Sequence, residues 1–110
     1  MIETVLRDYL ADNVSVPVLM ERPLSPPASY IILDRTGGSE EDKIPFARFA
    51  VQSYAGSLYE AAALSHSVCA LLDTMPDTQP VFSATKNSEY NFTDTQTKEY
   101  RYQAVYTIYY

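Results

Sequence analysis

His66 and Cys69 are the two residues whose types and spacing come closest to a site of chemistry. They stand three positions apart in a segment with helical periodicity, so both side chains can share one face, as a pair of zinc ligands would. The sequence has no other histidine or cysteine, so carboxylates would have to complete a metal shell, and a Cys-His nucleophile would lack its third, orienting group. Cys69 also falls within the apolar stripe of this segment, and free cysteine is among the most buried residue types. We therefore expect the pair to be structural, with no metal, no cofactor and no catalytic residue.

Motifs of common enzymes are missing from the sequence. One histidine is enough for a Ser-His-Asp arrangement, but no Gly-x-Ser-x-Gly elbow places a serine for it. The three glycines, Gly37, Gly38 and Gly56, form no glycine-rich phosphate loop. We expect that the protein is not an enzyme.

Three consecutive acids, Glu40, Glu41 and Asp42, follow the adjacent glycines Gly37 and Gly38. Such acids can bind a hard cation or act as acid and base, but an exposed charge run in a solvated loop is the interpretation we favour.

Three tyrosines near the end of the chain, Tyr100, Tyr102 and Tyr106, could stack bases as a single-strand binding platform does. Only Lys98 and Arg101 lie near them, and such platforms are bordered by basic residues. A sheet core, with hydroxyl groups that reach an interface, is the favoured interpretation.

The composition further limits the classes of protein to which this chain can belong. The 110 residues, of which 46% are hydrophobic, are expected to form a single domain over residues 1–110. A net charge of −6 argues against a grip on nucleic acid, which needs clustered lysine and arginine. The single cysteine cannot close an internal disulfide, and neither a signal peptide nor a membrane span is recognisable, so we expect a protein made in the cytoplasm with no membrane partner.

Local patterns predict the elements that would position these residues. Apolar spacing predicts helices over residues 2–12 and from Leu58 to residues 73–76, where Ser57 and Glu60 form a capping box. The stripe of the second helix is expected to consist of Leu58, Ala61, Ala62, Val68, Cys69, Leu72 and Met75. Strands are expected at residues 16–20, 29–35, 45–55, 81–92 and 99–110, the fourth of them irregular in its middle. Polar loops are expected at residues 36–43, joining two strands as a hairpin, and at residues 93–98.

This order, α-β-β-β-α-β-β, indicates the α+β class. We predict a two-layer sandwich in which two helices lie on one face of a mixed or antiparallel sheet. The strand of residues 99–110 is the clearest, because alternate residues from Tyr100 to Ile108 fall on one face.

Several ordered patterns in this sequence resemble the tail-completion proteins of long-tailed bacteriophages, also called tail terminator or tail-to-head joining proteins. They are the helix-first order, Leu33-Asp34-Arg35-Thr36-Gly37-Gly38 at the end of a strand, Phe49-Ala50-Val51-Gln52-Ser53-Tyr54 before an alanine-rich helix, and Tyr90-Asn91-Phe92-Thr93-Asp94 followed by Tyr100-Arg101-Tyr102-Gln103-Ala104. One departure is Thr93, where many relatives are expected to have a proline.

The resemblance implies a structural virion protein that caps the tail tube, stops tube polymerisation and forms part of the head-tail joint. Its partners would be copies of itself in a hexameric ring, the tail tube protein and a head connector or stopper protein, while DNA passes through the ring without specific binding. It would lie at the head-proximal end of the tail after assembly in the host cytoplasm. We predict two docking elements, because both are polar and tethered to strands: Gly37, Gly38, Glu40, Glu41, Asp42 and Lys43 in the first, and Tyr90, Asn91, Phe92 and Asp94 in the second.

Other classes remain open at this point. Another head-tail connector or a tail-tube subunit fits the same patterns, and so, more remotely, does a small cellular protein-binding adaptor. A small enzyme or metal protein has the least support from the residues.

Overall fold

The computed structural model describes residues 1–77 and 81–110, apart from the side chains of Glu41 and Asp77. Within these residues, two helices and five strands follow the predicted order α-β-β-β-α-β-β. They are α1 (Ile2–Asn13), β1 (Val18–Leu19), β2 (Tyr30–Glu41), β3 (Ile44–Tyr54), α2 (Leu58–Thr74), β4 (Ser83–Asn91) and β5 (Arg101–Tyr109), with a short 3-10 turn at Met75–Asp77.

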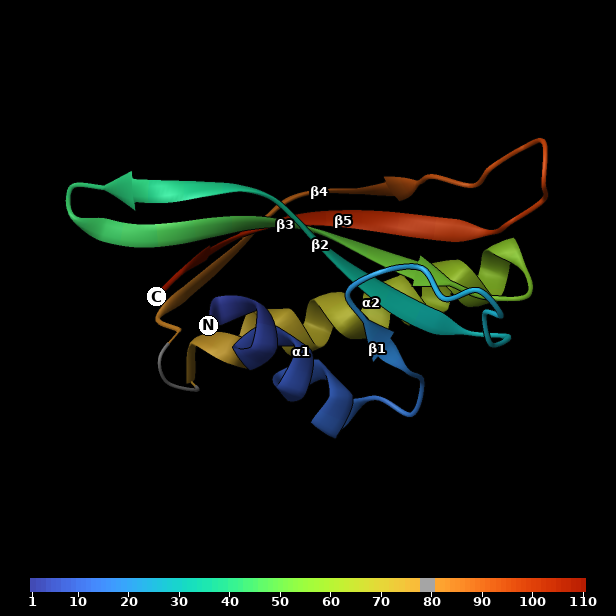
Figure 1. Cartoon of the computed structure of the whole chain (residues 1–110), viewed down its shortest axis with the longest axis horizontal. Coiled ribbons are helices and arrows are strands. Elements are labelled where there is room, and N and C mark those ends of the chain that lie inside the picture. Colours follow the sequence, from blue (N-terminus) through green and yellow to red (C-terminus); the bar gives the residue numbers. More distant parts are fainter. Residues whose placement is uncertain (78–80) are drawn as a thin grey trace.

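The five strands form one mixed sheet in the order β1-β2-β3-β5-β4. Strand β1 is parallel to β2, and every other neighbouring pair is antiparallel. Both helices lie on the same face of the sheet, as Figure 1 shows. The predicted two-layer α+β sandwich is therefore confirmed. Among the described residues, no helix is long and apolar enough to cross a membrane.

The first helix is amphipathic as predicted. Ile2, Leu6 and Leu10 are its buried residues, spaced four apart, so they lie along one side of the helix. Asn13, the last helical residue, donates from its side-chain amide to the carbonyl of Tyr9. The helix thus ends where the sequence leaves its apolar pattern.

The second helix begins at the predicted cap. Ser57 Oγ accepts a hydrogen bond from the backbone N–H of Glu60 at 3.1 Å, which satisfies one of the free donors of the first turn. Most of the expected stripe is buried, but Leu58 is 40% exposed and Ala62 is only partly buried, so the predicted stripe was wrong at Leu58. Leu58 is the first helical residue, ahead of the turns that contact the sheet.

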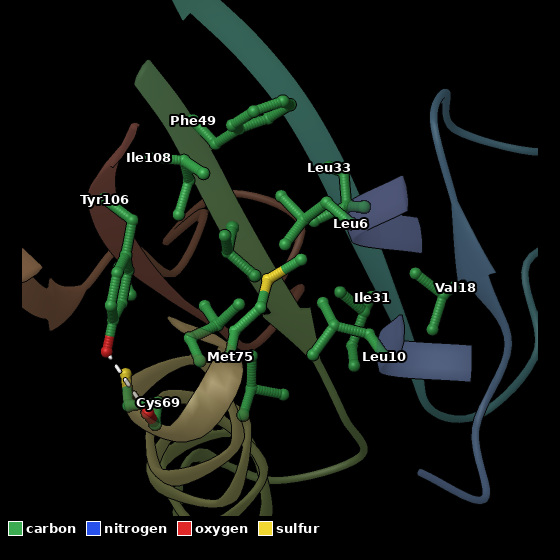
Figure 2. Packing of buried hydrophobic residues seen from close by; sticks show 14 of the residues in the cluster. Leu6, Leu10, Val18, Ile31, Leu33, Phe49, Cys69, Met75, Tyr106 and Ile108 are labelled. Carbon is green, nitrogen blue, oxygen red and sulfur yellow. Dashed lines mark hydrogen bonds between the residues drawn. The ribbon is translucent and has the colours of Figure 1, made fainter. Parts of the chain in front are cut away.

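The core lies between the helices and the sheet. Figure 2 shows side chains from both layers meeting there. Those that are fully or almost fully buried include Leu6, Leu10, Ile31, Leu33, Phe49, Cys69, Met75, Tyr106 and Ile108. Burial of this apolar surface holds the helices on one face of the sheet.

Residues 36–43 are not the exposed loop that the sequence predicts. Strands β2 and β3 continue to pair as far as Glu41 and Ile44, so only Asp42 and Lys43 form the turn. Both turn residues have positive φ, 51° and 67°, as a two-residue hairpin turn of the primed type requires. The hairpin itself is confirmed, and it is longer than expected. Its tip projects past the helical layer in Figure 1.

Two β-bulges interrupt the strand registers. One places Thr36 as an extra residue between Arg35 and Gly37 in β2, and the other places Asn87 between Lys86 and Ser88 in β4. The irregularity expected in the fourth strand is therefore confirmed.

Candidate functional site

Cys69 and His66, the pair considered as metal ligands or catalytic residues, lie in surroundings typical of structural residues. Cys69 is buried, and burial raises the pKa of its thiol, which keeps it protonated. His66 is exposed, and its Nδ1 donates to the carbonyl of Ala62 one turn earlier on α2. Within residues 1–77 and 81–110, no group of three or more His, Cys, Asp or Glu side chains is placed to hold a metal ion.

The three tyrosines considered for base stacking do not form one platform. Tyr106 is fully buried beneath α2, so it cannot stack on a base. Tyr102 is half-buried, with its ring 6.5 Å from that of His66, and Tyr100 is half-buried just before β5. Tyr106 therefore belongs to the core, as the favoured interpretation expected.

The hairpin tip gathers the first predicted docking element. Glu40, Asp42 and Lys43 are exposed there, and the backbone of Glu41 pairs with Ile44. Gly38 has a φ of 150°, and a Cβ at this position would lie 2.7 Å from the carbonyl oxygen of Phe46. Only glycine fits this close approach of two strands. Glu40 and Asp42 are thus carried at the end of a paired hairpin, residues 38–47, which we call the β arm, and not on a loop.

Apolar side chains lie next to the turn and at the root of this arm. Ile44 is 40% exposed and Phe82 is 56% exposed. The ring of Tyr109 contacts both Phe46, at a centroid distance of 5.7 Å, and Phe82, at 6.3 Å. Exposed aromatic and aliphatic groups next to charges are typical of protein-binding surfaces.

The second predicted docking element lies where β4 leads into the loop before β5. Tyr90 and Phe92 are 40% and 41% exposed, and their rings meet edge to face at 5.9 Å. Arg101 lies over the ring of Phe92, 4.5 Å from its centroid, and its Nε donates to the carbonyl oxygen of the same residue at 2.7 Å.

Local hydrogen bonds fix the loop that follows. Asn91 Oδ1 accepts from both the backbone N–H and the hydroxyl of Thr93, at 3.0 and 2.7 Å. Asp94 accepts from the backbone N–H groups of Gln96 and Thr97, and these bonds lower the pKa of its carboxyl group. Asn91 and Asp94 are therefore turn-forming residues, while Tyr90 and Phe92 present side-chain surface.

The structure brings the residues of each docking element together but keeps the two elements apart. In Figure 1 the β2–β3 turn and the loop between β4 and β5 project at opposite ends of the sheet. The register agrees, because Phe46, close to the turn, pairs with Tyr109, while Tyr54, at the other end of β3, pairs with Arg101.

A third feature escaped the sequence analysis: polar side chains form a network on the sheet face that the helices leave free. Gln52 bonds to Gln103 at 2.9 Å, and Gln103 bonds to the hydroxyl of Tyr90. The hydroxyl of Tyr54 donates to Gln52 and accepts from Arg101 at 3.1 Å. The sequence pattern that could have predicted this network is the set of polar residues that alternate with apolar ones in residues 45–55 and 99–110.

Part of this free face is closed by the segment between β1 and β2. Tyr30 and Tyr54 stack there with ring centroids 4.4 Å apart, and both are at least 96% buried. An ion pair between Arg22 and Glu99 ties the segment to the start of β5. Burial raises the pKa of Tyr30, whose hydroxyl has no hydrogen-bond partner among the described residues.

Comparison with known proteins gives no relative, since no family model and no curated protein matches the chain.

Proposed function

We propose that the protein is a structural virion subunit that closes into a ring, caps a bacteriophage tail tube and forms part of the head-tail joint. The observation that carries this proposal is the pair of docking elements at opposite ends of one sheet. A ring of identical subunits in head-to-tail contact has two unlike faces, and a tube terminator needs one face for the last tube ring and one for the head connector. A subunit with a different contact element at each end supplies both. The resemblance of the sequence to tail-completion proteins supplies the class and a ring of six copies.

The β arm supports the same function. Glu40 and Asp42 are exposed at its tip, and Ile44 and Phe46 lie on the strand just behind them. Surface of this kind, apolar residues bordered by charge, fits a protein partner with a basic rim.

The net charge of −6 bears on the DNA that would pass through such a ring. Exposed acids lie on the helices, at Asp8, Asp12, Glu60 and Asp73, and at the arm tip, at Glu40 and Asp42. Negative charge repels the phosphate backbone, so DNA would pass without binding. Reversal of Asp8 and Asp12 to lysine, which leaves the arm and its partner contacts intact, should then slow DNA ejection, and unchanged ejection and infectivity would count against this part of the proposal.

The decisive experiment is electron microscopy of particles produced without this protein. We expect overlong tails without heads. Tails of normal length joined to heads would reject the proposal, tails of normal length without heads would favour another connector, and the loss of all tubes would favour a tube subunit.

A hairpin-shortened variant tests the arm directly. Replacing residues 40–45 by Asn-Gly removes the tip and keeps the pairing of Ser39 with Phe46, which by alternation is a hydrogen-bonded pair like the pair Glu41 and Ile44 that flanks the native turn. The variant should fold, as judged by circular dichroism and urea unfolding, and fail to join heads to tails. The control is Ser39→Ala, which keeps the length of the arm and every residue of the docking element. Normal joining by the shortened variant would remove the arm from the docking assignment.

A further inference from the structure

Both lateral edges of the sheet are open in the part of the chain that the structure describes. Strand β4 is the last strand on its side and pairs only with β5. On the other side β1 covers β2 only at Ile31 and Ile32, which leaves residues 33–41 without an outer neighbour. Unpaired strand edges are ready templates for pairing with another chain.

Backbone groups point outward on both edges. Ile31 donates to Pro17 on the β1 side, so by alternation Leu33 also directs its N–H and C=O to that side. Phe92 donates to Arg101 in β5, so Asn91 and Glu89 direct theirs to the open side of β4. Each edge therefore offers both donors and acceptors.

The strand directions allow one copy to continue the sheet of another. Going across the sheet from β2 through β3 and β5 to β4, each step is antiparallel, so β4 runs opposite to β2. A second copy in the same orientation beside β4 would present its β2 antiparallel to that strand. Antiparallel pairing is the more stable of the two types.

We propose that copies of this chain associate edge to edge, with β4 of one copy paired to residues 33–41 of β2 in the next. The stretch has the same length as β4, which has nine residues. Its limits fix the register, because β1 occupies the edge before Leu33 and β4 ends at Asn91. Asn91 then lies opposite Leu33, and Ser83 lies opposite Glu41.

The two bulges support this register. With Asn91 opposite Leu33, the extra residue Thr36 lies opposite Ser88, and the extra residue Asn87 lies opposite Gly37. The inward and outward alternation changes at the same point in both strands, so residues on the helix-covered face meet residues on that face along the whole junction.

Charges at the junction are complementary. Arg35 lies opposite Glu89 on the helix-covered face. Lys86 lies diagonal to the exposed acid Glu40 and opposite Gly38. The guanidinium of Arg35 lies over Gly38 and is paired within its own chain with Glu3 at 3.4 Å. Hydrogen bonds from Ser65 and Lys86 lower the pKa of Glu89 against the opposing effect of burial, so this carboxylate is charged at neutral pH.

Engineered cysteine pairs test the register, because the single native cysteine, Cys69, is buried. Ser39 and Thr85 lie opposite each other in the proposed junction, on the same face, and both are exposed. The full-length variant Ser39→Cys/Thr85→Cys should form disulfide-linked oligomers under mild oxidation, in concentrated solution or in assembled particles. The matched controls are the two single variants and Glu40→Cys/Thr85→Cys, whose cysteines lie on opposite faces.

A charge-swap series tests the same junction without cysteine placement. Glu40→Lys, made in the cross-linking variant, should lower the yield of linked oligomers by about fivefold, and adding Lys86→Glu should restore it. No restoration would reject the assigned register.

Other results would overturn the inference. Dimers of a single-cysteine variant at equal yield would indicate two-fold edge pairing, and equal linking of the opposite-face control would indicate non-specific contact. No linkage in either setting would reject edge pairing. The inference rests on the proposed function only in expecting a closed ring. Overlong tails in particles without the protein, together with no cross-linking, would support the proposed function and reject the edge pairing. Cross-linking together with tails of normal length would support the edge pairing and reject the proposed function.

Discussion

The hydroxyl of Tyr106, in β5, donates a hydrogen bond to the carboxylate of Asp73 near the end of α2, at 3.1 Å. The same hydroxyl also lies 3.3 Å from the carbonyl oxygen of Cys69, and Figure 2 shows this bond within the core. The ring fills space between the sheet and α2 while its polar atom is satisfied at the edge of the helix. This one side chain therefore joins the central part of the sheet to the helical layer.

Tyr106→Phe should lower the free energy of unfolding by about 1–2 kcal/mol, because the acceptors on α2 lose a buried donor while the ring remains. Urea unfolding followed by circular dichroism measures the change. Tyr59→Phe, at a site that is 83% exposed, is the control and should change stability by less than about 0.5 kcal/mol. Equal effects of the two substitutions would show that the buried hydroxyl contributes nothing.

The same contact predicts sensitivity to alkali. Burial, together with the contacts to Cys69 and Asp73, raises the pKa of Tyr106 well above its ordinary value of about 10. Above that pH the unfolded chain loses a proton that the folded chain retains, so the folded state is destabilised as pH rises, by up to about 1.4 kcal/mol per pH unit. Urea midpoints at about pH 8 and about pH 11 should differ more for the native chain than for Tyr106→Phe. An identical drop in both proteins would contradict this assignment.

Ser57→Ala should destabilise the protein by about 1 kcal/mol, because the backbone N–H of Glu60 loses its acceptor at the start of α2. Ser67→Ala is the matched control on the same helix. Ser67 is exposed and donates to the carbonyl of Ala63 on its own helix, so its replacement by a better helix former should be neutral or slightly stabilising. Thermal unfolding of both variants decides the point, and similar losses would reject the cap as the cause.

Gly38→Ala should destabilise the hairpin by about 1–3 kcal/mol, since φ is 150° and the new Cβ would meet the backbone of β3. Gly37→Ala makes a close control, because nothing lies within 4 Å of the Cβ it would add. Urea unfolding should separate the two variants clearly. A tolerant Gly38 would mean that the strands can move apart at this position.

Thr93→Pro should lower the free energy of unfolding by about 1–2 kcal/mol. The substitution removes the N–H and the hydroxyl that bond to Asn91 Oδ1, and it also removes an acceptor for the backbone N–H of Arg101. Thr93→Ser keeps all three groups and should be close to neutral in the same thermal assay. A fully stable proline variant would show that the loop needs none of these bonds.

The elements with strong local signals were predictable from the sequence. The capping box placed the start of α2, the spacing of Ile2, Leu6 and Leu10 placed α1, and strict alternation placed β5. The outer half of the hairpin was not predictable, because residues 36–41 have little β propensity and the turn residues Asp42 and Lys43 include no glycine. They become strand because their backbone pairs with β3, a tertiary effect that overrides local preference.

The candidate surfaces, too, were predictable only in part. The polar residues of both docking elements could be named in advance, since they lie next to recognisable strands. Their separation to opposite ends depends on the pairing of β3 with β5, which skips β4 in the sequence order. The open edges depend on the same strand order, so no local pattern could reveal them.

The bulges at Thr36 and Asn87 have a geometrical consequence for an assembly. A bulge bends its strand and increases the local right-handed twist, so copies joined through these strands would be rotated relative to one another by a fixed angle instead of forming a flat ribbon. In the proposed ring, that angle would add to the twist between the other strands in deciding how many copies bring the last edge back to the first. Two extra residues, neither of which belongs to the hydrophobic core, would thus help to determine the size of the ring.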